Sequence, residues 1–311
     1  MSLSIKEVLL NEYTNITEHL LKNAPLWTDP KIISCYKNKL ILVVNEGTEI
    51  RGVWIIPYIQ QDEVKIAKRN YRFLPYSSPY ILEKDNLKRR DIMDVFFKYA
   101  TQVFNSIYLP FGVDFFDFSS IQARGALVEW RHSHILTEVI DLNKINSRLR
   151  NHIRSSQKTV DILIENDIDN FNFNIAINGS DEEKNQRKQL AINLINQNKA
   201  IIISAKNKQS YCAGVLMSFD DKTSYLMHSW QLQNTPRGTI SNLIFEAVKW
   251  TFEKKHLKYF DFEGSVIQQI DYFFDGFNAE ITPYGFVHWS KEEENLYSLI
   301  KKSINIDGRL I

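Results

Sequence analysis

The second half of this chain repeats, in a clearer form, an order of elements that the first half contains. The pattern of residues 145–290 predicts helix, strands, helix, strand, short helix and strand, whereas residues 1–140 predict a hairpin, an edge strand, a helix and a strand. The segments 115–120 (FFDFSS) and 259–265 (YFDFEGS) stand at corresponding points, each on the strand after the main helix of its half. This agreement favours an internal duplication of ~140 residues over chance similarity of short Phe/Asp runs.

Length and composition agree with two globular domains. The chain has 311 residues, and its 44% hydrophobic content supplies a core and excludes wholesale disorder. The 38 Lys and Arg against 37 Asp and Glu give a formal charge of +1, which argues against a protein that coats nucleic acid. The two cysteines, Cys35 and Cys212, exclude a disulfide scaffold and a cysteine zinc cluster, and they fit a reducing compartment.

The N-terminal segment does not have the pattern of a secretory signal. It lacks a basic stretch followed by an apolar run and a small-residue cleavage site. No run of 18 apolar residues occurs in the sequence. We therefore expect a cytoplasmic protein without a membrane span.

In the first half, two apolar runs within residues 40–60, separated by a turn at Gly47, predict a β-hairpin. Further elements are predicted as follows: a proline-containing loop or edge strand at 71–83, a helix at 91–107, a buried strand at 111–120, and extended segments at 126–130 and 134–142.

The second half alternates helices and strands. The predicted elements are a basic helix from 145, a strand at 160–164, a helix at 187–198, three strands within 200–231, an amphipathic helix at 238–256, a strand at 257–265, a short helix ended by Gly276, a strand pair at 279–289 and a terminal helix. We expect an α/β protein with domains 1–142 and 143–311. Packing of the terminal helix back on the N-terminal domain stays open.

Three blocks of the second half resemble a known family. They are 149–162 (LRNHIRSSQKTVDI), 237–265 (a long helix leading into YFDFEGS) and 269–284 (QIDYFFDGFNAEITPY). Together they resemble the GNAT-like acyltransferase domain of the bacterial Fem-type family. The resemblance implies two tandem GNAT-like domains with mixed sheets. It also implies N-acyl transfer from acyl-CoA or a similar thioester to an amine, such as an amino sugar or amino acid of cell-envelope or polysaccharide metabolism. The acyl donor would be a co-substrate, and we expect no permanently bound cofactor.

The start of the long helix is the candidate donor site. Free N–H groups of a first helical turn bind phosphate, and Arg237, Gly238 and Thr239 stand there. The sequence PRGTISN departs from the usual acetyl-CoA motif because no second glycine follows Gly238. The alternative is that Gly238 and Thr239 only start and cap the helix.

The basic helix is a second candidate binding surface. Arg150, Arg154 and Lys158 follow one another at four-residue spacing, which places neighbours in this series on one face. Such a stripe binds the phosphates of a tRNA, a nucleotide sugar or a pantetheine group. The alternative is an ordinary solvated helix surface.

Acyl transfer to an amine needs a proton acceptor. Asp261 and Glu263 flank one residue of a predicted strand, so their carboxylates are expected on one face. His228 is a further candidate base, and Ser229 and Trp230 on the same strand would orient the donor. The alternatives are a carboxylate that fixes a loop and a histidine held in the core.

The loop at 71–83 supplies Tyr76, Ser77 and Tyr80, whose hydroxyl groups suit a sugar or amino-acid acceptor. The alternative is a loop packed by its own tyrosines. No metal site is expected, because HExxH spacing is absent and His132 with His134 offers too few ligands.

Two other functions stay open. A Fem-type aminoacyltransferase would take its acyl group from aminoacyl-tRNA, and such enzymes often carry a coiled-coil insertion that this sequence lacks. A binding protein that kept the fold and lost the donor site is the other alternative. In either case we expect no partner nucleic acid apart from tRNA as a donor; the oligomeric state is left open.

Overall fold

The computed structural model describes residues 2–17, 24–69, 74–264 and 267–292. The chain forms two compact units: Met1–Arg131 with the segment that begins at Pro283, and His132–Thr282. The division falls inside strands β7 (Leu127–Leu136) and β13 (Glu280–Ser290), not at the expected boundary after residue 142. The predicted terminal helix lies outside the described residues.

The first unit contains a mixed sheet, with antiparallel and parallel strand pairs, covered by helices. Its elements are β1 (Leu3–Glu7), α1 (Leu10–Thr17), η1 (Leu26–Thr28), α2 (Pro30–Ile33), β2 (Lys39–Glu46), β3 (Glu49–Gln61), β4 (Val64–Lys68), β5 (Tyr80–Ile81), α3 (Asn86–Val103), β6 (Ser106–Pro110) and α4 (Ser119–Gln122). The strand order is β1-β2-β3-β4-β6-β13, and β5 pairs with β3. The antiparallel pair β2–β3 confirms the predicted hairpin.

Helix α3 begins earlier than its apolar stripe predicts. The carboxylate of Asp85 accepts the backbone N–H of Lys88 at 3.0 Å and caps the helix. The helix buries Phe96 and Phe97 against the sheet, where the Phe96 ring lies 6.0 Å from that of Trp54. Cap chemistry therefore sets the boundary, and the apolar face sets the packing.

The predicted strand at 111–120 is wrong, because the strand after α3 is β6 and it ends at Pro110. Residues 111–118 form turns and irregular backbone. Phe111, Phe115 and Phe118 are buried and pack on one another, with ring centroids 4.9–5.7 Å apart. Their spacing of three or four residues is that of a folded-back chain, not of a strand.

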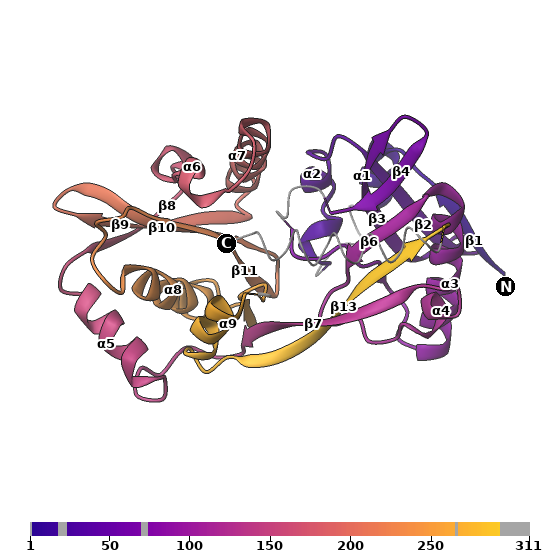
Figure 1. Ribbon diagram of the computed structural model, residues 1–311. Helices are drawn as coiled ribbons and strands as arrows, with labels where there is room; N and C mark the ends of the chain where they lie inside the picture. Colours follow the sequence, from indigo (N-terminus) through magenta and orange to yellow (C-terminus); the bar gives the residue numbers. More distant parts are fainter. Residues whose placement is uncertain (1, 18–23, 70–73, 265–266, 293–311) are drawn as a thin grey trace. The chain divides into compact units, whose positions relative to one another are not determined.

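The second unit is built in three layers. Its elements are the later part of β7, α5 (Ser147–Ser156), β8 (Asp161–Glu165), η2 (Ile168–Asn170), α6 (Phe173–Ala176), α7 (Asp181–Asn196), β9 (Ala200–Asn207), β10 (Ser210–Phe219), β11 (Thr223–Gln231), α8 (Thr239–Lys249) with a π-helical extension η3 (Trp250–Lys254), β12 (Tyr259–Asp261) and α9 (Gln268–Asp275). Its strand order is β7-β12-β11-β10-β9-β8. Figure 1 shows α5 and α8 on one face of β8–β11 and α6 and α7 on the other.

Two further expectations need correction. Strand β7 is continuous over Leu127–Leu136, so the extended segment predicted at 134–142 ends early, in turns. The predicted strand pair at 279–289 is the single strand β13. Pro283 and Gly285 lie within this strand, and Phe286–Ser290 pairs in register with β6.

Each unit contains one strand–helix–strand crossover of the same kind. In the first unit α3 joins β4 to β6, which are parallel at Ile66–Lys68 and Ser106–Tyr108. In the second unit α8 joins β11 to β12, which are parallel at Thr223–Tyr225 and Tyr259–Asp261. Within the described ranges, no helix combines the length and the apolar character that crossing a bilayer requires.

Candidate functional site

Strands β11 and β12 separate shortly after they meet. Their parallel pairing ends at Tyr225 and Asp261, but β11 continues to Gln231 beside β10. Strand β12 ends at Asp261, where it also pairs with Ile135 of β7. The later part of β11 therefore leaves β12, and the two strands form a fork in the sheet of the second unit.

A β-bulge lies on β11 at this fork. Leu226 faces Met217 and His228 faces Leu216, so Met227 is an extra residue. Leu226 packs with Met217 in the core. His228 and Trp230 lie on the opposite face of the sheet, because Trp230 faces Gly214 and belongs to the cavity lining beside α6 and α7. Regular alternation along a strand would place Leu226, His228 and Trp230 on one face, but the bulge separates Leu226 from the other two.

His228 is held as a neutral imidazole. Burial of the ring and the positive charge of Arg187 lower its pKa to about 3. A general base works best with a pKa near the working pH. The environment of His228 therefore weakens the interpretation of this residue as the proton acceptor.

Asp261 is buried and fixes the backbone around it. The hydroxyl of Ser133 and the backbone N–H of Glu263, the latter at 2.7 Å, both donate to its Oδ1 atom. The prediction that Asp261 and Glu263 share a strand face is wrong, because the strand ends at Asp261 and Glu263 has φ +64°. Asp261 acts as a structural acceptor, and Glu263 is a half-buried carboxylate.

Gly238 is required by packing at the start of α8. It has φ +86°, and a Cβ atom there would lie 2.3 Å from the carbonyl oxygen of His152 on α5. The hydroxyl of Thr239 donates to the carbonyl of Pro236 at 2.7 Å. Both residues therefore have a structural role that does not require a phosphate ligand.

The positive charges on and near α5 lie in three different settings. Arg150 donates to the carbonyls of Leu142 and Asn143 at 3.4 and 3.2 Å, so it fixes the preceding loop. Arg154 and Lys158 are exposed. The pKa of His152 is lowered, first by burial and then by the positive charges of Arg237 and Arg148. Positive charge from α5 and from the turn before α8 therefore gathers at the start of α8.

A cavity of about 540 Å³ lies on the α6–α7 face of the sheet. Amide and aromatic side chains line it: Asn170, Phe171, Asn172, Phe173, Asn174, Asn185, Tyr211 and Trp230. Lys184, Lys188 and Asp169 also line it, and Lys188 forms an ion pair with Asp169 at 2.9 Å. Its volume is that of a small-molecule site, and its lining suits a polar ligand with an apolar face, such as a sugar or amino acid.

No family model and no curated protein sequence matches this chain. Solved structures do match it over nearly its full length. FemX is 12% identical, with a TM-score of 0.61, and the match covers 96% of this chain and 99% of FemX. The C-terminal domain of a putative lysylphosphatidylglycerol synthetase from Agrobacterium fabrum is 11% identical, with a TM-score of 0.60 and coverages of 97% and 100%. A tandem GNAT protein from the clavulanic acid biosynthesis pathway is 8% identical, with a TM-score of 0.53 and coverages of 92% and 98%.

This chain has the tandem GNAT fold of Fem-type proteins. The α/β class and the doubled architecture expected from the sequence are thereby confirmed. At such low identity the likeness shows the fold, and it leaves donor and acceptor to be argued from the residues.

In the first GNAT-like unit, the described part of the predicted acceptor loop, residues 74–83, is largely buried. Tyr76 packs edge-on against Trp27 and Tyr284, with ring centroids 5.5 and 5.4 Å apart. The carbonyl of Ser77 accepts the indole N–H of Trp54 at 2.7 Å. Tyr80 is half-buried on β5. The structure thus gives Tyr76 and Ser77 packing roles within the first unit.

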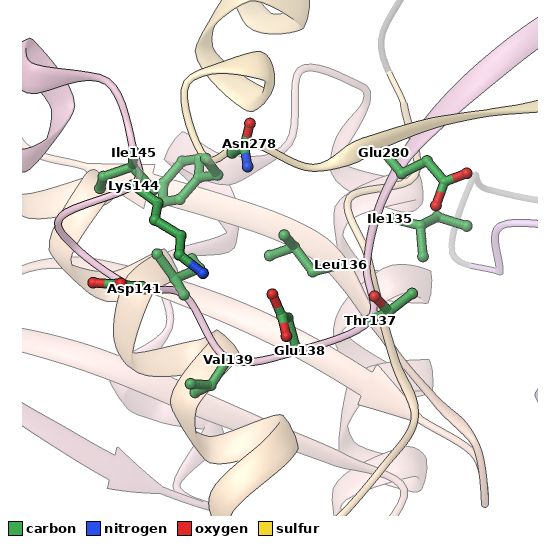
Figure 2. Close-up of a pocket in the computed structure, with 12 residues that line it drawn as sticks. Ile135, Leu136, Thr137, Glu138, Val139, Asp141, Lys144, Ile145, Asn278 and Glu280 are labelled. Atoms are coloured by element: carbon green, nitrogen blue, oxygen red, sulfur yellow. The ribbon is translucent and has the colours of Figure 1, made fainter.

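A smaller pocket in the second GNAT-like unit holds about 110 Å³, too little for a substrate of the expected size. Figure 2 shows the charged side chains of Glu138, Asp141, Lys144 and Glu280 around it. We do not assign it a role in acyl transfer.

Sequence reasoning missed one cluster of chemically active side chains. His132 and His134 on β7 lie next to Asp271 on α9, and Asp275 follows one turn later. The HSH and D-x-x-x-D spacings were visible in the sequence, but the contact between a strand and a helix 140 residues away was not.

Proposed function

We propose that the chain is an N-acyltransferase that moves an acyl group from an activated donor to an amine. The observation that supports this proposal most strongly is the fork between β11 and β12, with the bulge at Met227 and the start of α8 beside it. A strand that leaves its neighbour presents backbone N–H and C=O groups along its open edge, and such groups bind and polarise an acyl carbonyl.

The donor would lie along the open part of β11 with its phosphates toward α8. Arg237 and Arg148 supply positive charge at that end, and Ser229 is exposed on the strand. These features support a thioester of coenzyme A, whose phosphates suit the cationic end. Gly238 and Thr239 would then shape the helix start, and Arg237 would contact the phosphate.

The acceptor would enter from the cavity that Trp230 lines. The acceptor ammonium first loses one proton to a carboxylate, and the free amine so formed attacks the donor carbonyl to make the new C–N bond. When the tetrahedral intermediate collapses, the C–S bond breaks and the second proton from nitrogen passes to the leaving thiolate. Glu263 is the residue that we assign to the first of these transfers, because Oδ1 of Asp261 already accepts from Ser133 and from the Glu263 backbone.

Aminoacyl-tRNA is the second candidate donor. The exposed Arg154 and Lys158 extend the cationic surface of α5 beyond Arg148 and suit a longer anionic ligand.

Isothermal titration separates the donors. Acetyl-CoA and CoA should bind, and Arg237→Gln should weaken both about tenfold or more, whereas the exposed control Lys254→Gln should not. Binding of charged tRNA but not of CoA would assign the second donor. Failure of both ligands to bind would overturn the proposed function.

A further inference from the structure

Four side chains with metal-ligating atoms converge at one edge of the second unit. The cluster consists of His132, His134, Asp271 and Asp275, and we refer to it as the His–Asp cluster. Residues His132 and His134 alternate with Ser133 on β7, so both rings lie on one side of the strand. Asp271 and Asp275 are one turn apart on α9, so both carboxylates lie on one face of the helix.

The distances within the cluster bring the ligand atoms together. His132 Nε2 lies 2.8 Å from Asp271 Oδ1, and His134 Nε2 lies 2.9 Å from Asp275 Oδ1. His134 Nε2 is also 3.8 Å from the same Asp271 oxygen. The two imidazole rings are edge-on with centroids 5.5 Å apart. Both imidazoles therefore direct Nε2 at the carboxylates of α9.

The surrounding structure holds this strand in place. Ser133, between the two histidines, donates its hydroxyl to the buried Asp261 carboxylate. The carbonyl of His134 accepts the N–H of Phe262 at 3.0 Å. Gly264 approaches so closely that a Cβ atom there would lie 2.1 Å from the His132 carbonyl oxygen. These contacts fix β7 from its other side and leave the imidazoles to face α9.

We propose that the His–Asp cluster binds a divalent transition metal ion, with Zn²⁺ as the best fit. Two imidazole nitrogens and two carboxylate oxygens are a donor set that zinc prefers in four-coordinate sites. Ligand atoms about 2.0–2.1 Å from a tetrahedral zinc are roughly 3.3 Å apart. The ligand atoms of His132, His134 and Asp271 all lie within 4.8 Å of one another. The distances from Asp271 Oδ1 to the two histidine Nε2 atoms, 2.8 and 3.8 Å, lie on either side of the spacing expected around zinc.

Exposure supports access for an ion. The side chain of His134 is fully buried, whereas those of His132 and Asp275 are 39% and 43% exposed. The inner ligand is thus fixed, and the outer ligands can turn to close around the ion. Four protein ligands would make the site structural, joining α9 to β7. This inference does not depend on the proposed acyl transfer.

Zinc titration of the full-length protein, first freed of metal with EDTA, tests the site. We expect one Zn²⁺ per chain by isothermal titration calorimetry, together with a rise in Tm on zinc addition. His132→Gln and Asp271→Asn should each lower the affinity at least tenfold, because each removes a direct ligand. The exposed controls Glu138→Gln and His256→Asn should leave the affinity unchanged.

Cobalt substitution adds a second measurement. Co²⁺ in the site should show the visible absorption of a tetrahedral ion, and His132→Gln should abolish it. Because His132 is partly exposed, this variant should fold, which circular dichroism checks. The proposal would be overturned if the wild type does not bind zinc, or if His132→Gln and Asp271→Asn both bind it as tightly as the wild type. Either result would leave two hydrogen-bonded His–Asp pairs.

Discussion

The carbonyl oxygen of His152 on α5 occupies the place where a side chain on Gly238 of α8 would begin, 2.3 Å from the ideal Cβ position. Two helices of the second unit therefore meet where α8 starts, and the meeting depends on a residue without a side chain. This contact also brings the charges of Arg148 and Arg237 near one ring, that of His152.

Gly238→Ala should destabilise the protein through two effects. The left-handed φ of +86° costs an alanine about 1 kcal/mol, and the clash with His152 adds to it, for a total of about 2 kcal/mol or more. Gly125→Ala is the matched control, because Gly125 has a φ of +81° and no atom lies within 4 Å of the position that a Cβ would take. Urea unfolding should show a clearly larger loss for Gly238→Ala. Equal losses in the two variants would contradict the packing role.

Ser133→Ala should lower the free energy of unfolding by about 1–3 kcal/mol, because it leaves the buried Asp261 oxygen with one donor fewer. Ser229→Ala removes the same hydroxyl from an exposed position of the same unit and should change stability by less than about 0.5 kcal/mol. Chemical denaturation of both variants makes the comparison. Near-neutral behaviour of Ser133→Ala would show that the Asp261 carboxylate does not need this donor.

His228 should make the protein sensitive to acid. Its pKa is about 3 in the folded protein, against an ordinary value of 6.5 that we take for the unfolded chain. Between these values the unfolded chain binds one more proton at this position, so stability falls as the pH is lowered from 6.5 to 3. His228→Gln should flatten this part of the stability profile, measured by denaturation at a series of pH values. A wild-type-like slope in the variant would place the acid sensitivity elsewhere.

Glu263→Gln should lower kcat by about 10²-fold or more while donor binding is retained, because the variant cannot accept the ammonium proton. Steady-state kinetics with the donor identified by titration gives kcat, and calorimetry gives the donor Kd. The exposed Glu138→Gln variant serves as the control. Full turnover by Glu263→Gln would remove this residue from the reaction.

Periodicity and the Fem-type resemblance predicted the class of fold, the doubled architecture and the main helices. They succeeded where a long apolar stripe decides the structure, as in α8. They failed where tertiary contacts decide it. Phe111, Phe115 and Phe118 have strand-like composition but pack on one another in turns. The bulge at Met227 has no sequence signature, and it separates the face of Leu226 from that of His228.

The candidate site was predicted in part. Asp261 lies at the fork, as its position on the strand after the long helix suggested, but its carboxylate fixes backbone. Arg150 was predicted on the binding stripe, and it binds the carbonyls of a preceding loop instead. The partner of a side chain in a distant segment is decided by the fold, and spacing along one element cannot supply it.

The division of the chain inside β7 and β13 has a consequence for synthesis on the ribosome. The second unit is one continuous segment, His132–Thr282, whereas the first is completed only when Phe286–Ser290 pairs with β6. The amino-terminal half must therefore wait, with the edge of β6 open, until synthesis has reached Ser290. The later-made unit can fold first, and the earlier-made one closes last.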